Sequence, residues 1–114
     1  MADCLFCKIL AGDIPSTEVA STETTYAFRD INATAPTHVL VIPREHIATA
    51  DDLRAEHAAV LSDVFATAQA VARSEGVAES GYRLVFNVGE DASNSVPHLH
   101  LHVIGGRKLG WPPG

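Results

Sequence analysis

The sequence lacks two features: an apolar run long enough to cross a membrane and an excess of positive charge. No uninterrupted apolar segment approaches the roughly 20 residues that a membrane-spanning helix needs, and the first residues lack the basic and apolar stretches of a signal peptide. The 8 Lys and Arg are outnumbered by 14 Asp and Glu, which gives a formal net charge of -6. This disfavours nucleic-acid binding, because neutralising phosphates needs clustered cations. We therefore expect a cytoplasmic protein with neither membrane nor nucleic-acid partners.

Cysteine is scarce as well, since the chain has only Cys4 and Cys7. Structural disulfides are rare in a reducing cytoplasm. A thioredoxin-like redox motif would follow a strand, and no strand is expected before this pair. Two thiolates at this spacing supply half of a tetrahedral zinc site. The residues alone leave zinc binding and two idle thiols as equal alternatives, and the six histidines could supply the two missing ligands.

The 114 residues, 46% of them hydrophobic, suffice for one domain and are too few for two, so we expect a single domain over residues 1–114. Apolar residues that recur at 3.6-residue spacing, with Thr49 as cap and Gly76 as stop signal, predict one long helix. Alternating or β-branched residues predict strands. The expected elements are a short helix within residues 4–16, strands at 18–21, 24–31, 37–43, 82–88 and 98–103, and the long helix between residues 49 and 76.

These elements predict a sheet with one long helix packed on one of its faces. The last two strands are joined by a polar loop over residues 89–95 rather than by a helical crossover, which favours an antiparallel sheet. Alternate side chains of a strand point to opposite faces. The long helix would therefore cover the face that carries Leu99, Leu101 and Val103, and histidines would lie on the other face.

His98, His100 and His102 are the alternating histidines of that last strand. One interpretation is that these histidines simply face water on the exposed side of a half-buried sheet. Metal binding is a second, although three such residues span about 13 Å and cannot all reach one ion without a bulge. Phosphoryl transfer is a third, because a neutral imidazole can attack phosphorus and neighbouring imidazoles can hold phosphate oxygens. The preceding polar loop offers donors for an anion.

The motif His-Leu-His-Leu-His-Val-Ile over residues 98–104 resembles the signature of the histidine triad (HIT) family. The segments CLFCKILAGDIPS, FRDINATAPTHVLVIPREHI and GGRKLGWPPG are similar, in the same order, to segments of its Hint branch, so the resemblance covers nearly the whole chain. It implies an HIT-like α+β fold with a five-stranded antiparallel sheet, one long helix and a short N-terminal helix. It also implies a homodimer in which two sheets form one ten-stranded sheet.

The resemblance implies hydrolysis of purine nucleoside 5′-phosphoramidates, conjugates of AMP or GMP with an amine, at the α-phosphate and without an organic cofactor. His100 would attack phosphorus to give a nucleotidyl-histidine, His102 would contact the α-phosphate, and Ser95 would relay a proton to the leaving amine. Asp30 would receive the ribose hydroxyls, with Ile31 against the base. The residues implied to bind substrate are Asp30, Ile31, Asn87, Ser93, Asn94, Ser95, His100 and His102.

Two alternatives to this function remain. One is a dinucleoside polyphosphate hydrolase of the same superfamily, which Ser95 and the WPPG tail disfavour because both resemble the Hint branch. The other is a nucleotide-binding or zinc-binding interaction module in which turnover is incidental. Assays of adenosine phosphoramidates and diadenosine polyphosphates on the same protein distinguish these possibilities.

The Cys4–Cys7 pair resembles a zinc-binding version of the family, which implies a structural zinc held by Cys4, Cys7, His46 and His98. In metal-free relatives the residue matching His46 lies in the catalytic histidine network instead, and the two roles exclude each other.

Three further residues receive weaker assignments. His38 and His57 are expected to be ordinary structural or surface residues. Trp111 either packs the tail or, by resemblance, borders the leaving-group pocket of the other subunit.

Overall fold

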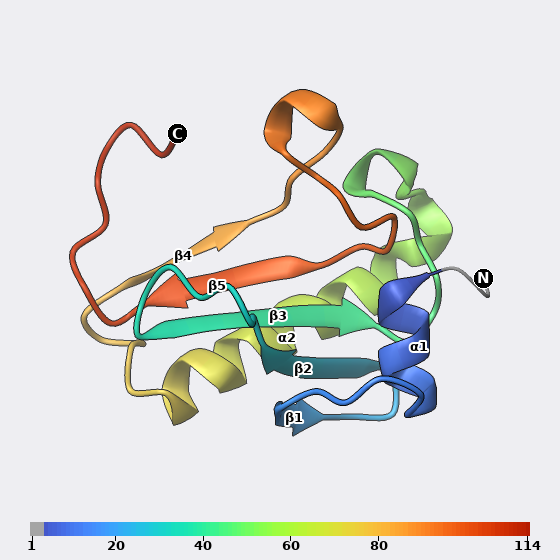
Figure 1. The fold of residues 1–114 in the computed structure, drawn as a ribbon, viewed down its shortest axis with the longest axis horizontal. Helices are drawn as coiled ribbons and strands as arrows, with labels where there is room; N and C mark the ends of the chain where they lie inside the picture. Colours follow the sequence, from blue (N-terminus) through green and yellow to red (C-terminus); the bar gives the residue numbers. More distant parts are fainter. Residues whose placement is uncertain (1–3) are drawn as a thin grey trace.

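Figure 1 shows the fold of the computed structural model, which describes residues 4–114. The five strands form one antiparallel sheet in the order β1-β2-β3-β5-β4. The predicted α+β class, with a long helix and a short N-terminal helix, is confirmed. The elements are α1 (Leu5–Ala11), β1 (Glu18–Ser21), β2 (Thr25–Arg29), β3 (Thr37–Pro43), η1 (Ala50–Asp52), η2 (Ala55–His57), α2 (Ala58–Ser74), β4 (Tyr82–Val85), η3 (Glu90–Ala92) and β5 (Leu101–Gly105).

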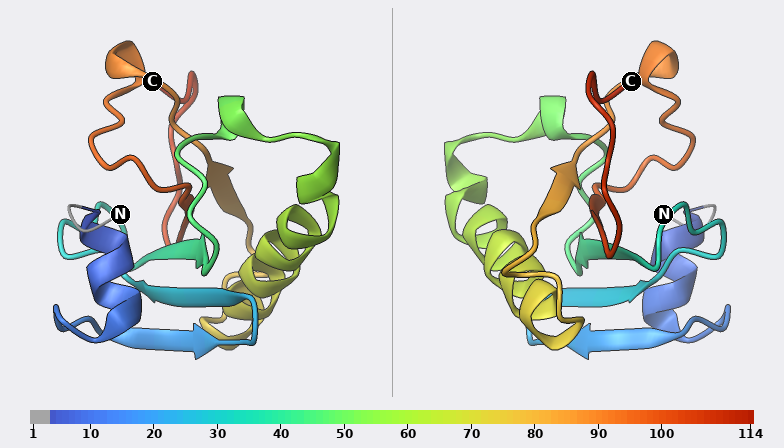
Figure 2. Two further views of the ribbon diagram at one scale, coloured as in Figure 1. Left: turned by 90° about the vertical axis from the view of Figure 1, so that its right-hand side faces the viewer. Right: turned by 90° about the vertical axis from the view of Figure 1, so that its left-hand side faces the viewer.

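The two α-helices lie on opposite faces of the sheet (Figure 2). On one face α2 packs against β3 and β5, where Leu101 and Val103 are buried as predicted. On the other face α1 places Phe6 against Phe28 of β2. Because β3 lies between these layers, all of its residues are buried. This explains why residues 39–43 of the strand are a continuous apolar run rather than an alternating one.

The long helix begins later than the sequence predicts. Thr49 and Asp52 form the expected capping box, but it caps the 3₁₀ turn η1 rather than α2. The chain is extended at Arg54, and α2 starts only at Ala58. Residues 54–59 contain no large apolar side chain, so this segment has little apolar surface with which to pack against the sheet as a longer helix.

Two strands are shorter than predicted. β2 ends at Arg29 rather than at residue 31, because the next residue, Asp30, accepts the Asn32 backbone N–H at 2.9 Å and turns the chain. β4 ends at Val85 rather than at residue 88, and Val88 beyond its end is 43% exposed.

The last strand starts at Leu101, so His98 and His100 precede it, contrary to the predicted strand over residues 98–103. The His98 N–H bonds the Val96 carbonyl at 2.9 Å, a bond between residues two apart that belongs to a tight turn. The Leu99 N–H bonds the carbonyl of Ile47, outside the sheet, at 2.6 Å. Only His102 of the three alternating histidines therefore lies within the sheet. None of the helices within residues 4–114 is long and apolar enough to span a membrane.

Candidate active site and metal cluster

A pocket of about 560 Å³ lies on the α1 side of the sheet. Leu5, Phe6 and Ile9 of α1 give it an apolar wall. The residues predicted to bind substrate line it with one exception, Asn94. Those that line it are Asp30, Ile31, Asn87, Ser93, Ser95, His100 and His102.

Asn94 has a different environment from its neighbours in the polar loop. Its backbone N–H bonds the Gly89 carbonyl at 3.1 Å and closes the loop. Its side-chain oxygen is buried and finds no hydrogen-bond partner within residues 4–114. Ser93, which precedes it, has a left-handed backbone with φ of 64°. This turn directs the side chains of Ser93 and Ser95, but not that of Asn94, to the pocket.

His100 holds its ring proton on Nδ1. That nitrogen lies 2.7 Å from the backbone carbonyl oxygen of His98, which can only accept a hydrogen bond. The Nε2 atom of the neutral ring therefore keeps its lone pair. Burial lowers the pKa of His100, so the ring is neutral near pH 7. A neutral imidazole with a free nitrogen on the wall of a pocket is a competent nucleophile.

His102 carries the opposite tautomer because of its contact with His38. The Thr34 backbone N–H donates to His38 Nδ1 at 3.1 Å, so the proton of His38 is on Nε2. His38 Nε2 lies 2.9 Å from His102 Nδ1 and donates to it. The proton of His102 is consequently on Nε2, which is buried and has no partner among the described residues.

Burial, helped by the neighbouring His100 and His38, lowers the pKa of His102 to about 4. The ring is therefore neutral near pH 7, with one N–H that no group within residues 4–114 accepts. Such a donor suits an anionic oxygen, because a phosphate oxygen would satisfy the buried N–H.

His38 makes a contact that its sequence context does not predict. An ordinary structural or surface residue is expected there, whereas the side chain is buried and bonded to His102. The available signal was a lone histidine within an otherwise apolar, fully buried strand, which requires a hydrogen-bond partner. The partner follows from the register of β3 against β5, where Leu40 faces His102 and His38 is its diagonal neighbour.

Asp30 lies at the pocket beside this pair. One carboxylate oxygen accepts the Asn32 N–H, and the other lies 3.3 Å from His38 Nε2. The next residue, Ile31, is 97% exposed. A carboxylate and an exposed apolar side chain thus border the same pocket.

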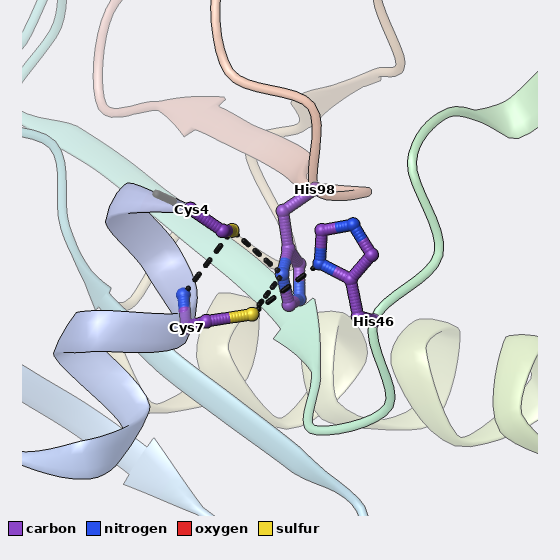
Figure 3. Close-up of side chains that lie close together, drawn as sticks. All are labelled: Cys4, Cys7, His46 and His98. Carbon is purple, nitrogen blue, oxygen red and sulfur yellow. Dashed lines mark hydrogen bonds between the residues drawn. The ribbon is translucent and has the colours of Figure 1, made fainter. Parts of the chain in front are cut away.

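Cys4, Cys7, His46 and His98 converge from three separate parts of the chain (Figure 3). The cysteines lie at the start of α1, His46 in the loop after β3, and His98 just before β5. His98 Nδ1 lies 3.4 Å from Cys4 Sγ and 3.5 Å from Cys7 Sγ, and Cys7 Sγ lies 3.3 Å from His46 Nδ1. Across a tetrahedral zinc ion, sulfur and nitrogen ligands are about 3.6 Å apart.

The donor chemistry of these residues fits zinc. His98 Nε2 donates to the Pro43 carbonyl at 2.9 Å, so Nδ1 turns its lone pair toward the thiols. A carbonyl that orients the second ring nitrogen is the usual support of a metal-binding histidine. Burial and the adjacent Cys4 thiol raise the pKa of the Cys7 thiol. A bound cation reverses that effect by stabilising the thiolates.

His46 lies in this cluster, and its ring meets that of His98 edge-on with centroids 4.9 Å apart. The histidine that bonds to His102 is His38 rather than His46. His57 accepts the Arg54 N–H at 2.9 Å, as expected for a structural residue.

A second group, Asp30, His38 and His102, has side-chain ligand atoms within 4.8 Å of one another. In this group His38 has no free lone pair, because Nδ1 accepts the Thr34 N–H and the Nε2 proton is donated to His102. The group is therefore a hydrogen-bonded network rather than a metal site.

Comparison with known proteins gives one family. The HIT domain model matches residues 11–109. The chain is 43% identical over 106 residues to the purine nucleoside phosphoramidase of Escherichia coli, covering 93% of this chain and 89% of that protein. It is 45% identical over 112 residues to the 14 kDa zinc-binding protein of Zea mays, covering 96% and 87% of the two chains. The crystal structure of a HIT family hydrolase from Legionella pneumophila matches with a TM-score of 0.96 and 48% identity, covering 98% of this chain and all of that one.

Proposed function

This chain belongs to the HIT family, and we propose on that basis that it hydrolyses purine nucleoside 5′-phosphoramidates at the α-phosphate. The observation that carries the proposal is the pair of opposite tautomers on His100 and His102. The centroids of the two rings lie 5.1 Å apart, and both residues line the same pocket. His100 has a free lone pair on Nε2, and His102 has an N–H on Nε2 that is free to donate. Attack on phosphorus requires at least a nucleophile and a neighbouring hydrogen-bond donor that stabilises the anionic phosphate oxygens.

The proposed reaction has two steps. His100 Nε2 forms a bond to the α-phosphorus while the phosphorus–nitrogen bond to the amine breaks, and His102 Nε2–H donates to a phosphate oxygen. Ser95, which lines the pocket, relays a proton from solvent to the departing amine, because an amine leaves readily only when protonated. Water then attacks the phosphorus of the nucleotidyl-histidine, the bond from phosphorus to His100 Nε2 breaks, and the nucleoside monophosphate leaves while the proton of the attacking water passes to solvent. Both steps use only water and side chains of this chain.

The rest of the pocket suits a nucleotide. The Asp30 carboxylate oxygens have further lone pairs beside their contacts with the Asn32 N–H and His38, and these can accept ribose hydroxyls. Ile31 and the apolar wall formed by Phe6 and Ile9 offer contact to a purine ring. We assign further contacts with the phosphate and the leaving group to Asn87 and Ser93, which line the same pocket as His100 and His102.

The test is a direct comparison of substrates on purified protein. Adenosine and guanosine phosphoramidates are assayed beside diadenosine polyphosphates. The proposal predicts kcat/KM at least about a hundredfold higher for the phosphoramidates, a difference of about 2.7 kcal/mol in activation free energy. Faster cleavage of the polyphosphates favours the related polyphosphate hydrolase, and nucleotide binding without turnover favours an interaction module.

We also propose that the cluster of Cys4, Cys7, His46 and His98 holds a structural zinc ion. Four protein ligands close a tetrahedral shell and leave no open position for substrate. The ion would supply cross-linking between three distant segments, not phosphorus chemistry. A reducing compartment such as the cytoplasm would keep both thiols available as ligands.

Finally, we propose a homodimer joined edge to edge through β4. The strand order puts β4 at one edge of the sheet, where backbone groups can pair with a second copy. Trp111, in the tail that follows, is 83% exposed and is available to a partner subunit. Light scattering coupled to size-exclusion chromatography checks this, and a monomer at micromolar concentration contradicts it.

A further inference from the structure

His98 takes part in two sites at once. Its ring nitrogen Nδ1 faces the sulfur atoms of Cys4 and Cys7. Its backbone carbonyl oxygen accepts the Nδ1–H of His100 at 2.7 Å. The ring and the carbonyl belong to one residue, which precedes β5 and is held outside the sheet ladder. Whatever fixes the ring of His98 therefore also fixes the acceptor that sets the tautomer of His100.

Helix α1 makes a second connection between the cluster and His100. Phe6 lies between the two cysteines, is buried, and contacts the His100 ring edge-on with centroids 5.1 Å apart. It also contacts the ring of His98 at 6.1 Å. The helix has only seven residues, too few to be stable alone. Its position against the sheet depends on its packing and on the cysteines at its start.

None of the four cluster residues lines the pocket. They can influence the reaction through the His98 carbonyl and through α1, which carries Phe6, rather than through contact with substrate. The distinction matters because a purely structural cross-link changes stability, whereas a positioning device changes the chemical step of a folded enzyme.

We propose that the cluster of Cys4, Cys7, His46 and His98, when it holds a metal ion, positions His100 for attack as well as stabilising the fold. The metal keeps the His98 ring and α1 in place, so the carbonyl of His98 stays bonded to His100 Nδ1–H and the lone pair stays on Nε2. Without metal, that hydrogen bond loosens and the ring of His100 samples orientations and a tautomer that cannot attack. The proposal rests on the nucleophilic role given to His100 under the proposed function.

The test uses His46, the ligand that belongs to neither α1 nor the histidine segment. His46→Ala removes one ligand, and His46→Cys restores a four-ligand shell with a thiolate in place of an imidazole. Val64→Ala is the matched control, because it removes buried apolar volume beneath the opposite face of the sheet without touching the cluster. If His46→Ala does not fold, His46→Asn, which is closer in size to histidine, takes its place.

Three quantities are measured on protein shown to be folded by circular dichroism: the metal content, the solvent exchange of the His100 Nδ1 proton by NMR, and kcat and KM for an adenosine phosphoramidate. The His100 signal is identified by its loss in His100→Gln. For His46→Ala we expect no bound metal, faster proton exchange, and a kcat lower by about ten- to a hundredfold with KM within about threefold of wild type. His46→Cys should restore all three, and Val64→Ala should leave them unchanged.

A folded, metal-free His46→Ala protein with wild-type proton exchange and wild-type kcat overturns the proposal, as does wild-type protein that binds no metal. The proton-exchange measurement needs no substrate. It therefore still decides whether the cluster positions His100 if wild-type protein fails to cleave phosphoramidates, a result that counts against the proposed function alone.

Discussion

His38 Nε2 lies 2.9 Å from His102 Nδ1, between the neighbouring strands β3 and β5. This contact, together with the bond from His100 to the carbonyl of His98, gives two adjacent imidazoles opposite tautomers. Each tautomer is set by a backbone group that can only donate or only accept a hydrogen bond. The Thr34 N–H sets the tautomer of His102 through His38, and the His98 carbonyl sets that of His100. The backbone thus sets the tautomers of the proposed nucleophile and the proposed phosphate donor before any substrate binds.

The first prediction concerns His38. His38→Phe removes the donor that keeps the proton of His102 on Nε2, and it leaves His102 Nδ1 without a partner. Losing a buried hydrogen bond of this kind costs about 1–3 kcal/mol, so kcat should fall about 5- to 150-fold. Affinity for adenosine, which has no phosphate and is measured by calorimetry, should change by less than about threefold, because His38 does not line the pocket.

His57→Gln is the control for this variant, since His57 lies outside the pocket and bonds only its own turn and Glu45 among the described residues. It should leave kcat unchanged. A His38→Phe protein as active as His57→Gln would show that the contact with His102 has no part in the reaction.

Much of the fold could be predicted from local patterns. The apolar run at residues 37–43 and the 3.6-residue stripe along α2 each carry their own signal. The start of α2 could not be predicted in this way, because the capping box correctly identified at Thr49 belongs to the short 3₁₀ turn η1 that precedes the helix. A cap marks the beginning of a helical turn, and only packing decides whether that turn continues.

The site was less predictable, because its decisive contacts join distant residues. The alternation of the histidines predicts one continuous strand, but His98 is held by the Pro43 carbonyl and by the cysteines of α1, and it leaves the sheet. The partner of His38 depends on the strand register, which the sequence of a single strand does not determine. The family resemblance supplied candidate residues, and the contacts among them had to come from the structure.

The second prediction concerns recognition of the sugar. Asp30→Asn keeps an oxygen for the Asn32 N–H and so preserves the turn, but it loses the charge that accepts ribose hydroxyls. We expect the variant to lose more kcat/KM with ribonucleoside phosphoramidates than with their 2′-deoxy analogues. Equal losses for the two sugars would mean that Asp30 serves only the turn.

The third prediction concerns the metal. Cys4 is also the N-cap of α1, with Sγ accepting the Cys7 N–H, and serine is a good substitute in that role. Cys4→Ser should therefore keep the cap yet lose the zinc and lower the melting temperature, because binding of a structural zinc contributes to folding free energy.

Wild-type protein should contain about one zinc per chain, measured by mass spectrometry of the metal, and a chelator should lower its melting temperature but not that of Cys4→Ser. Cys4→Ser should retain measurable phosphoramidase activity at low temperature. Wild-type protein that is equally stable with and without chelator would refute the zinc assignment.

The fourth prediction concerns pH and stability. An unfolded histidine binds its proton near pH 6.5, whereas burial lowers the pKa of His102 in the folded chain to about 4. As the pH falls through this window the unfolded state binds more protons, so the free energy of unfolding decreases. The contribution of His102 is fully present above about pH 6.5 and is lost as the pH approaches 4.

Urea unfolding at a series of pH values measures this effect. His102→Gln removes one such group, so its stability should depend less steeply on pH between 6.5 and 4 than that of wild type. Parallel curves for the two proteins would show that His102 is not held neutral in the folded state.

The covalent attack by His100 is tested most directly by trapping the intermediate. Wild-type protein is mixed with an adenosine phosphoramidate, stopped during turnover in alkaline denaturant, and analysed by peptide mass spectrometry. We predict one adenylyl group on His100 in wild type and none in His100→Ala, whose turnover should be at least about a thousandfold slower while AMP still binds. Turnover by wild type with no adduct, an adduct on another residue, or a His100→Ala protein that keeps a tenth of the wild-type rate would contradict the account.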